Sequence, residues 1–318
     1  MTISHRRVTY RNGRGQEVVG VLSVPDDRRW RGVVYLVPGF ERQLYHYGPV
    51  SESFCRHGFA TLRTDLTNHR GASEGEMRHF TLASAADDMI SVVTALTEAG
   101  EPVVVVPSSL SARSAVRALS EHPRLASGLV LLLPVVDVDY TVKRASVSQW
   151  NLDRWRDGSV TDRHKLVVIV EHEIEANFAR AAIEDGWCGI DSVASEIARI
   201  KAPVIAICAR EDDWVLADHV QQALSAPAGD PRQVVILEST SHQLTKNPIA
   251  VRLLIESLVT SIEQIAGLPA RPVVHLEFEQ VVSTVRRERR WAKSQYHDLS
   301  EDESASVSTQ GSSQGVHP

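Results

Sequence analysis

Short apolar runs recur along this chain and alternate with segments whose apolar residues follow a helical period. A continuous apolar run is typical of a parallel strand buried on both faces, whereas recurrence every three to four residues indicates a helix. The predicted strands are Gly32–Val37, Phe59–Arg63, Val103–Val106, Gly128–Val136, Val204–Cys208 and Val234–Leu237. The predicted helices are Leu44–His57, Thr81–Ala99, Ala112–Leu119, Ala217–Ser225 and Ile249–Ile265. This alternation predicts a mainly parallel sheet with right-handed crossovers and helices on its faces.

The N-terminal segment has a different pattern. Two strand-like runs, Arg7–Thr9 and Glu17–Val24, are separated by Asn12-Gly13, a dipeptide typical of tight hairpin turns. We therefore expect an antiparallel edge in front of the parallel sheet.

Two further segments interrupt the alternation. Residues 137–199 are long and mostly polar, with only Leu166–Val170 reading as a strand, so we expect an inserted lid there. After the core, Pro272–Phe278 predicts a short strand and Arg286–Arg290 a solvated helix face. The expected organisation is a domain over 1–270 containing the lid, a partly ordered extension over 271–299, and a disordered tail over 300–318, where apolar residues are scarce.

Composition narrows the class of protein. The 318 residues are 43% hydrophobic with a net charge of −6, which is ordinary for a globular protein and argues against nucleic-acid binding. The three cysteines are scattered, so neither a disulfide framework nor a zinc site is expected. The N-terminus lacks the apolar core of a signal peptide, and no apolar run approaches the roughly 20 residues of a membrane span. We expect a cytoplasmic protein.

The junction between the Val103–Val106 strand and its following helix contains candidate chemistry. Pro107-Ser108-Ser109-Leu110-Ser111 occupies the place of the G-x-S-x-G turn of α/β-hydrolases, in which the central serine is the nucleophile. Ser109 is then the candidate nucleophile, with proline and serine where glycines are usual. The alternative is an ordinary helix N-cap, a role in which serine is common.

A nucleophilic serine needs a base, an acid that orients the base, and donors for the oxyanion. Asp212 and Asp213 follow one late strand and His242 follows the next, in the order serine, acid, histidine. Helix capping by the aspartates and a surface histidine are the alternatives. The expected oxyanion donors are the backbone amides of Phe40, after an early strand, and Leu110, after the serine.

Five segments together resemble the acyltransferases of bacterial luminescence. They are PGFERQLYHYGPVSESFCRHGFATLRTD, NHRGASEGEMRHFTL, PSSLSARSA, AREDDWV and TSHQL, in order between about residues 15 and 265. Those proteins are myristoyl-ACP thioesterases that divert acyl groups to a reductase complex. The resemblance implies an α/β-hydrolase fold with a lid insertion and a Ser-Asp-His triad of Ser109, Asp212 and His242, with Asp213 still open. The chain departs from the family at Pro107 and in its extension beyond about residue 270.

The implied activity is acyl transfer from a fatty acyl thioester through an acyl-serine to water or another acceptor, with no metal or cofactor required. The expected partners are an acyl-CoA or acyl carrier protein and, as a further candidate, a reductase or synthase. The insertion would supply apolar and Trp residues to an acyl pocket. Arg113, close to the serine, is expected to be structural, with a phosphopantetheine contact as its alternative. Rival functions are a carboxylesterase, a tailoring acyltransferase of secondary metabolism and a silent binding scaffold.

Overall fold

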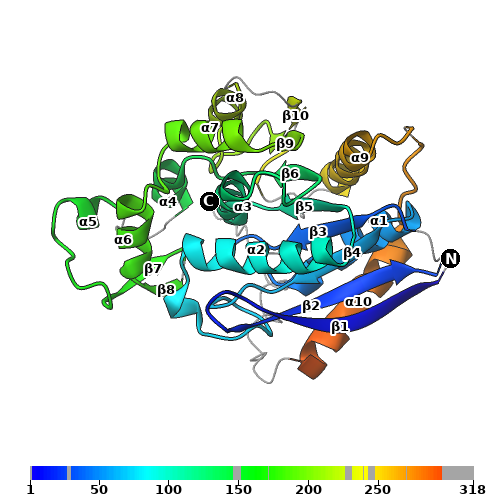
Figure 1. The fold of residues 1–318 in the computed structure, drawn as a ribbon, viewed down its shortest axis with the longest axis horizontal. Helices are drawn as coiled ribbons and strands as arrows, with labels where there is room; N and C mark the ends of the chain where they lie inside the picture. Colours follow the sequence, from blue (N-terminus) through cyan, green and yellow to red (C-terminus); the bar gives the residue numbers. More distant parts are fainter. Residues whose placement is uncertain are drawn as a thin grey trace, which may run out of the picture.

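An eight-stranded, mainly parallel sheet forms the centre of the protein, with strand order β1-β2-β4-β3-β5-β6-β9-β10 (Figure 1). The computed structural model describes residues 2–26, 30–145, 152–170, 172–225, 231–238, 240–242, 248–269 and 271–295. The strands of this sheet are β1 (Ile3–Arg11), β2 (Glu17–Pro25), β3 (Val33–Val37), β4 (Ala60–Thr64), β5 (Val103–Pro107), β6 (Gly128–Leu132), β9 (Val204–Ala209) and β10 (Arg232–Leu237). The expected mainly parallel sheet is confirmed.

The hairpin of β1 and β2 forms the antiparallel edge that the sequence predicts. The two strands pair from Ile3 opposite Pro25 to Arg11 opposite Glu17, and β2 also runs antiparallel to β4. The side-chain oxygen of Asn12 accepts the backbone N–H groups of Arg14 and Gln16, at 3.0 and 2.9 Å. This Asx-type bonding closes the turn locally.

Helices cover both faces of the sheet. One face carries α2 (Leu82–Glu98), α3 (Leu110–Glu121) and α8 (Ala217–Leu224), and the other carries α1 (Gly48–Arg56), α9 (Pro248–Ile265) and α10 (Phe278–Gln295) (Figure 1). Two short 3₁₀ turns, η1 (Leu44–Tyr47) and η2 (Met77–His79), lie in the connecting loops. Thr81 caps α2 in a capping box with Ser84. The central strands are buried from end to end because helices pack on both of their sides.

The extension after α9 differs from the prediction at two points. Pro272–Phe278 forms no strand; the chain is irregular until α10 begins. The Arg286–Arg290 run is not wholly solvated, because Glu288 is buried and its carboxylate binds the buried Arg63 of β4 at 2.9 Å. One charged residue of the run thus docks α10 against β4, where an unpaired buried Arg63 would be costly.

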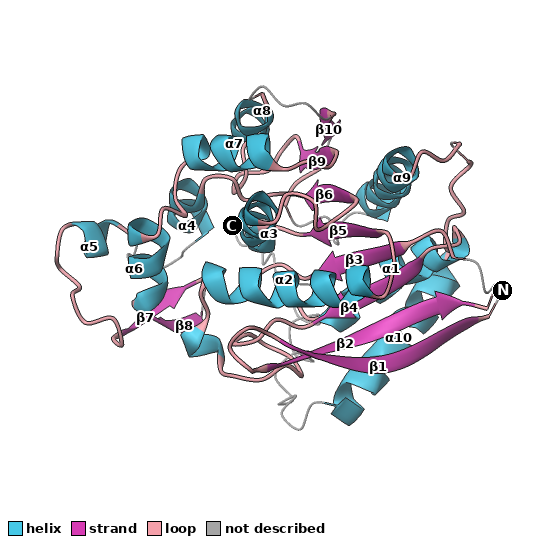
Figure 2. Cartoon of the chain, viewed as in Figure 1, coloured by secondary structure: helices cyan, strands magenta, loops and turns pink. Residues whose placement is uncertain are grey.

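The segment between β6 and β9 is more ordered than the sequence suggests. It contains α4 (Val138–Ala145), α5 (Asp153–Arg156), the hairpin β7 (Leu166–Ile169) and β8 (His172–Glu175), α6 (Asn177–Glu184) and α7 (Ile190–Arg199). Much of it lies beyond the carboxyl ends of the parallel strands (Figure 2). The sequence pattern missed β8 because His-Glu-Ile-Glu has one apolar residue, which faces the core. β6 is shorter than expected: it ends at Leu132, since Leu133 adopts a positive φ of 46°. The tail that we expect to be disordered lies outside the described residues.

Buried Arg113 fastens this segment to α3. Its guanidinium binds Glu196 of α7 at 2.5 and 2.9 Å and donates to the carbonyl of Trp187 at 2.8 Å. The Trp187 ring lies under Arg113 and Arg117. Arg113 is therefore structural, and the alternative of a phosphate contact is wrong. In the described part of the chain, no helix is both long and apolar enough to span a membrane.

Candidate active site

Ser109 occupies a strained turn between β5 and α3. Its φ of 52° and ψ of −123° are unfavourable for a residue with a Cβ, at a cost on the order of 1–3 kcal/mol. Both of its backbone groups are anchored: the amide donates to Leu132 at 2.9 Å, and the carbonyl accepts from Val135 at 3.1 Å. These two bonds to β6 and its following loop hold the turn, which presents the half-buried Ser109 hydroxyl at the strand's end.

Pro107, the unusual residue in this motif, lies in a gap of the β5–β6 ladder. The two strands pair through Val104 and Val105, and the pairing resumes only as a bridge between Ser108 and Leu132. Proline has no backbone N–H to donate, so it is tolerated where a strand needs no ladder bond. The position of Pro107 satisfies that requirement.

Ser109, His242 and Asp212 form one chain of hydrogen bonds. Ser109 Oγ lies 3.1 Å from His242 Nε2, and His242 Nδ1 lies 2.7 Å from Asp212 Oδ2. The buried Asp212 carboxylate accepts, so the proton lies on Nδ1 and leaves Nε2 as the acceptor of the serine hydroxyl. This is the arrangement in which a histidine can remove a serine proton.

The loops after β9 and β10 are joined by backbone hydrogen bonds. The amide of Arg210 donates to Leu237 at 2.9 Å, and that of Glu211 donates to Thr240 at 2.8 Å. The other oxygen of Asp212 accepts the amides of Trp214 and Val215, at 2.9 and 3.0 Å. These contacts aim the Asp212 carboxylate at the imidazole of His242.

Asp213, the alternative acid, is placed differently. It is exposed, whereas the side chain of Asp212 is buried and contacts His242. The Trp214 ring packs against the imidazole, with centroids 4.9 Å apart. The structure thus brings Asp212, and not Asp213, to the histidine.

The loop after β3 lies against the serine turn, and these two segments carry the expected oxyanion donors, the amides of Phe40 and Leu110. A Cβ added to Gly39 would lie 3.1 Å from Ser109 Cβ and 3.2 Å from the Ser108 carbonyl oxygen, so this close approach favours glycine. Phe40 follows, and its amide has no acceptor among the described residues. Leu110 is the first residue of α3 and lies at the positive end of the helix dipole. The amides of the next two residues, Ser111 and Ala112, donate to the carbonyls of Ser108 and Ser109 at 3.1 Å.

Three hydroxyl groups to which the sequence assigns no role, those of Tyr47, Ser108 and Ser111, tie these two segments together. Ser111 Oγ donates to the carbonyl of Pro38 at 2.6 Å. Tyr47 hydrogen-bonds to Ser108 through their hydroxyls and accepts the Gly39 amide at 3.2 Å. Burial raises the pKa of Tyr47, so this phenol stays neutral. Ser111, which replaces the second glycine of the motif, thus links the serine turn to the loop after β3. Its unusual place in the motif could have indicated this role from the sequence, whereas nothing in the sequence indicated the role of Tyr47.

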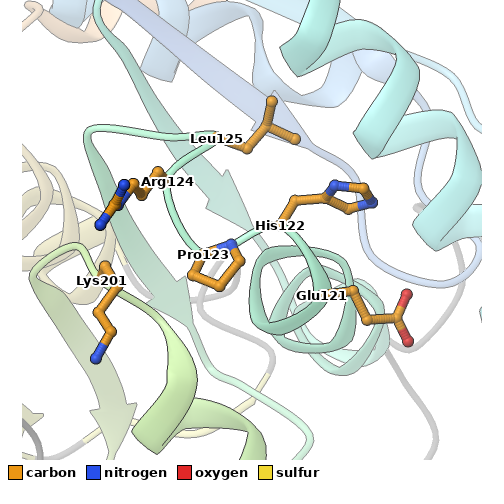
Figure 3. A pocket seen from close by; sticks show the side chains of 6 residues that line it. All are labelled: Glu121, His122, Pro123, Arg124, Leu125 and Lys201. Atoms are coloured by element: carbon orange, nitrogen blue, oxygen red, sulfur yellow. The ribbon is translucent and has the colours of Figure 1, made fainter.

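A large surface depression lies elsewhere. An open pocket of about 560 Å³ lies at the end of α3. It is lined by Glu121, His122, Pro123, Arg124, Leu125 and Lys201 (Figure 3). These residues precede β6 and β9, so they lie at the amino ends of the strands. Ser109 and Asp212 follow strands and lie at the opposite edge, where ligands of open α/β sheets bind.

Comparison with known proteins shows that this chain is similar to bacterial acyl transferases. The chain is 29% identical to an acyl transferase of Photorhabdus luminescens over 232 residues, covering 72% of this chain and 73% of the relative. It is 26% identical to one of Photobacterium phosphoreum over 273 residues, covering 83% and 86%.

Solved structures share the fold at low sequence identity. Est1E of Butyrivibrio proteoclasticus with bound ferulic acid has a TM-score of 0.65 and 17% identity, over 81% of this chain and all of that one. A monoacylglycerol lipase of Paleococcus ferrophilus has a TM-score of 0.57 and 18% identity, over 83% and 99%. The fold is that of the α/β-hydrolases. A family model described as acyl transferase matches residues 5–295, and the chain therefore belongs to the acyl transferase family of bacterial luminescence systems.

Proposed function

We propose that this protein is a serine acyltransferase that takes fatty acyl groups from thioesters through an acyl-Ser109 intermediate. The observation that carries the proposal is the hydrogen-bonded chain Ser109–His242–Asp212 at a strained strand–helix turn. Family membership supports acyl transfer as the reaction class.

In the first step, Ser109 Oγ attacks the thioester carbonyl while His242 Nε2 takes the hydroxyl proton. Asp212 holds the imidazole in the required tautomer and stabilises the imidazolium that forms. The amides of Phe40 and Leu110 meet the oxyanion, aided by the positive end of α3. The tetrahedral intermediate then collapses, and the departing thiolate receives the proton from His242.

In the second step, water or another acceptor attacks the acyl carbon while His242 Nε2 takes its proton; the bond to Ser109 Oγ then breaks, and Oγ receives that proton from His242. The segment between β6 and β9 would act as the lid: His172 of β8 and Phe178 of α6 pack on the Phe40 and Phe80 rings beside the serine turn. The donor would be an acyl-CoA or an acyl carrier protein.

Intact-mass spectrometry of the full chain with a panel of acyl-CoAs and acyl carrier proteins tests the proposal. We expect a mass increase of one acyl group on the wild type and none on Ser109→Ala; His242→Ala should lack steady-state turnover. An adduct that persists in Ser109→Ala would refute the assignment. Oxygen esters of matched chain length run in parallel, and exclusive turnover of those esters would instead support a carboxylesterase.

A further inference from the structure

His69 contacts the loop that carries the candidate oxyanion amide. It lies in the loop after β4 and is buried, and its Nε2 accepts the backbone amide of Glu41 at 3.1 Å. Its ring meets Phe40 and Phe80 edge-on, with centroids 5.7 and 5.3 Å apart. His69 therefore touches the residue that carries the amide and the residue after it.

Glu41 needs such support because its backbone is strained. Its φ is 68°, in the left-handed region that a residue with a Cβ seldom adopts. Strained backbone persists only where its surroundings hold it. Two histidines do so: His69 accepts the amide, and His172 of β8 lies 2.7 Å from the Glu41 carboxylate.

The loop that contains His69 is stabilised by hydrogen bonds to a buried carboxylate. The buried carboxylate of Asp65 accepts the amide of Leu44 at 2.8 Å and that of Ala72 at 2.9 Å. Gly71, with φ of 136°, packs so closely on Asp65 that a Cβ there would overlap it. The loop after β4 thus holds the loop after β3 at two points, through Asp65 and His69.

The protonation state of His69 suits an acceptor. Burial lowers the pKa of this imidazole to about 4, so Nε2 is unprotonated at neutral pH. The proton then lies on Nδ1, which faces the carbonyl of Arg70 at 3.4 Å.

We propose that His69 is a positioning residue that orients the Phe40 amide toward the oxyanion. The Phe40 amide lies between two backbone amides that are fixed by hydrogen bonds. The Gly39 amide donates to the Tyr47 hydroxyl, and the Glu41 amide donates to His69 Nε2. The assignment rests on the proposed acylation of Ser109, since an oxyanion arises only if Ser109 attacks a carbonyl or a phosphonyl centre.

The test compares variants that keep or remove the acceptor. His69→Phe keeps a ring against Phe40 but cannot accept the Glu41 amide, whereas the longer side-chain oxygen of His69→Gln can reach it. We expect His69→Phe to slow both acylation by thioesters and phosphonylation by a fluorophosphonate by about tenfold to a hundredfold, because small displacements of catalytic groups cost this much. KM should change little, and His69→Gln should recover most of the rate.

His57 provides a matched control. It is also buried, and its Nε2 accepts the backbone amide of Val274 at 3.0 Å. It lies on the other face of the sheet, where α1 and α9 pack. His57→Phe should leave the rate per folded molecule unchanged. If His69→Phe does not fold, His69→Asn replaces it, because its oxygen is too short to reach the amide and it should be slow as well.

The outcomes separate the two proposals. Wild-type rates in folded His69→Phe or His69→Asn would overturn the role of His69 while leaving acyl transfer intact. Phosphonylation of Ser109 without any thioester reaction would overturn the proposed substrate, and the phosphonylation rates would still test His69. Failure of Ser109 to react with either reagent would overturn both.

Discussion

Asp212 and His242 are 30 positions apart and meet through a hydrogen bond of 2.7 Å between Oδ2 and Nδ1. The bond forms because adjacent parallel strands, β9 and β10, end at the same edge of the sheet. The other carboxylate oxygen of Asp212, Oδ1, accepts two backbone amides. The neighbouring Asp213 is exposed, so the two aspartates should behave very differently when they are changed.

Replacing Asp212 by asparagine should lower kcat by about 10³- to 10⁴-fold, because an amide that donates to the imidazole stabilises the wrong tautomer. Asp213→Asn changes the same side chain one residue away and should keep nearly full activity. Steady-state turnover of an acyl thioester measures both. Equal losses in the two variants would contradict the role of Asp212.

Gly39→Ala should slow acylation of Ser109 by about tenfold or more. The added methyl would lie 3.1 Å from Ser109 Cβ and 3.2 Å from the Ser108 carbonyl oxygen, so one of the two loops must shift. The rate of adduct formation by intact mass checks this. Gly15→Ala provides a control at a glycine where an added Cβ meets nothing; its positive φ of 80° should reduce stability but not the acylation rate per folded molecule. An unchanged rate in Gly39→Ala would show that the approach of the two loops is not needed.

Glu288→Ala should destabilise the protein by about 3–5 kcal/mol, because it leaves Arg63 buried and uncompensated. Glu279→Ala, at an exposed site on the same helix, should change the free energy of unfolding by no more than about 0.5 kcal/mol. Urea unfolding compares the two variants.

The double variant Arg63→Met with Glu288→Leu should lose less stability than the sum of its single changes, since it removes both charges together. Additive losses would mean that the two side chains contribute independently.

The buried imidazole of His69 should make stability depend on pH. Its pKa is about 4 in the folded protein and about 6.5 in the unfolded chain, so between these values the unfolded state binds more protons. The stability that neutral His69 contributes is complete above about pH 6.5 and is lost as the pH falls toward 4. Between pH 7 and pH 5 this loss amounts to about 2 kcal/mol.

Urea unfolding at pH 7 and pH 5 measures this effect. His69→Gln should lose about 2 kcal/mol less than the wild type over this range, because glutamine does not titrate. His122→Gln, at an exposed position, should follow the wild type. Identical pH dependence in His69→Gln and wild type would indicate that His69 is protonated without penalty.

Much of the fold could be read from the chain because its signals are local. Continuous valine-rich runs are typical of strands buried on both faces, as in β3 and β5. Asn12 closes the loop between Arg11 and Glu17 locally, because its side-chain oxygen accepts the amides of Arg14 and Gln16. The order Ser109, Asp212, His242 along strand ends likewise follows from the alternation of strands and helices, since parallel strands place their ends at one edge.

Other features arise only when distant segments meet. Adjacent aspartates look alike in sequence, and the backbone amides after β9 decide that Asp212 faces the imidazole. Glu288 reads as one charge in a basic run until Arg63, 225 positions earlier, lies beside it. In the sequence nothing distinguishes His69 from the other twelve histidines. Only the folded chain places its imidazole where it accepts the amide of the strained Glu41.

The sequence by itself therefore determined the sheet, its helical layers and the serine turn, because apolar periodicity and turn chemistry act over a few residues. The tertiary structure decided which polar side chain serves which partner. A buried carboxylate or imidazole is stable only with a specific hydrogen-bond donor, acceptor or counter-charge, and the segments that supply these come together only in the folded chain.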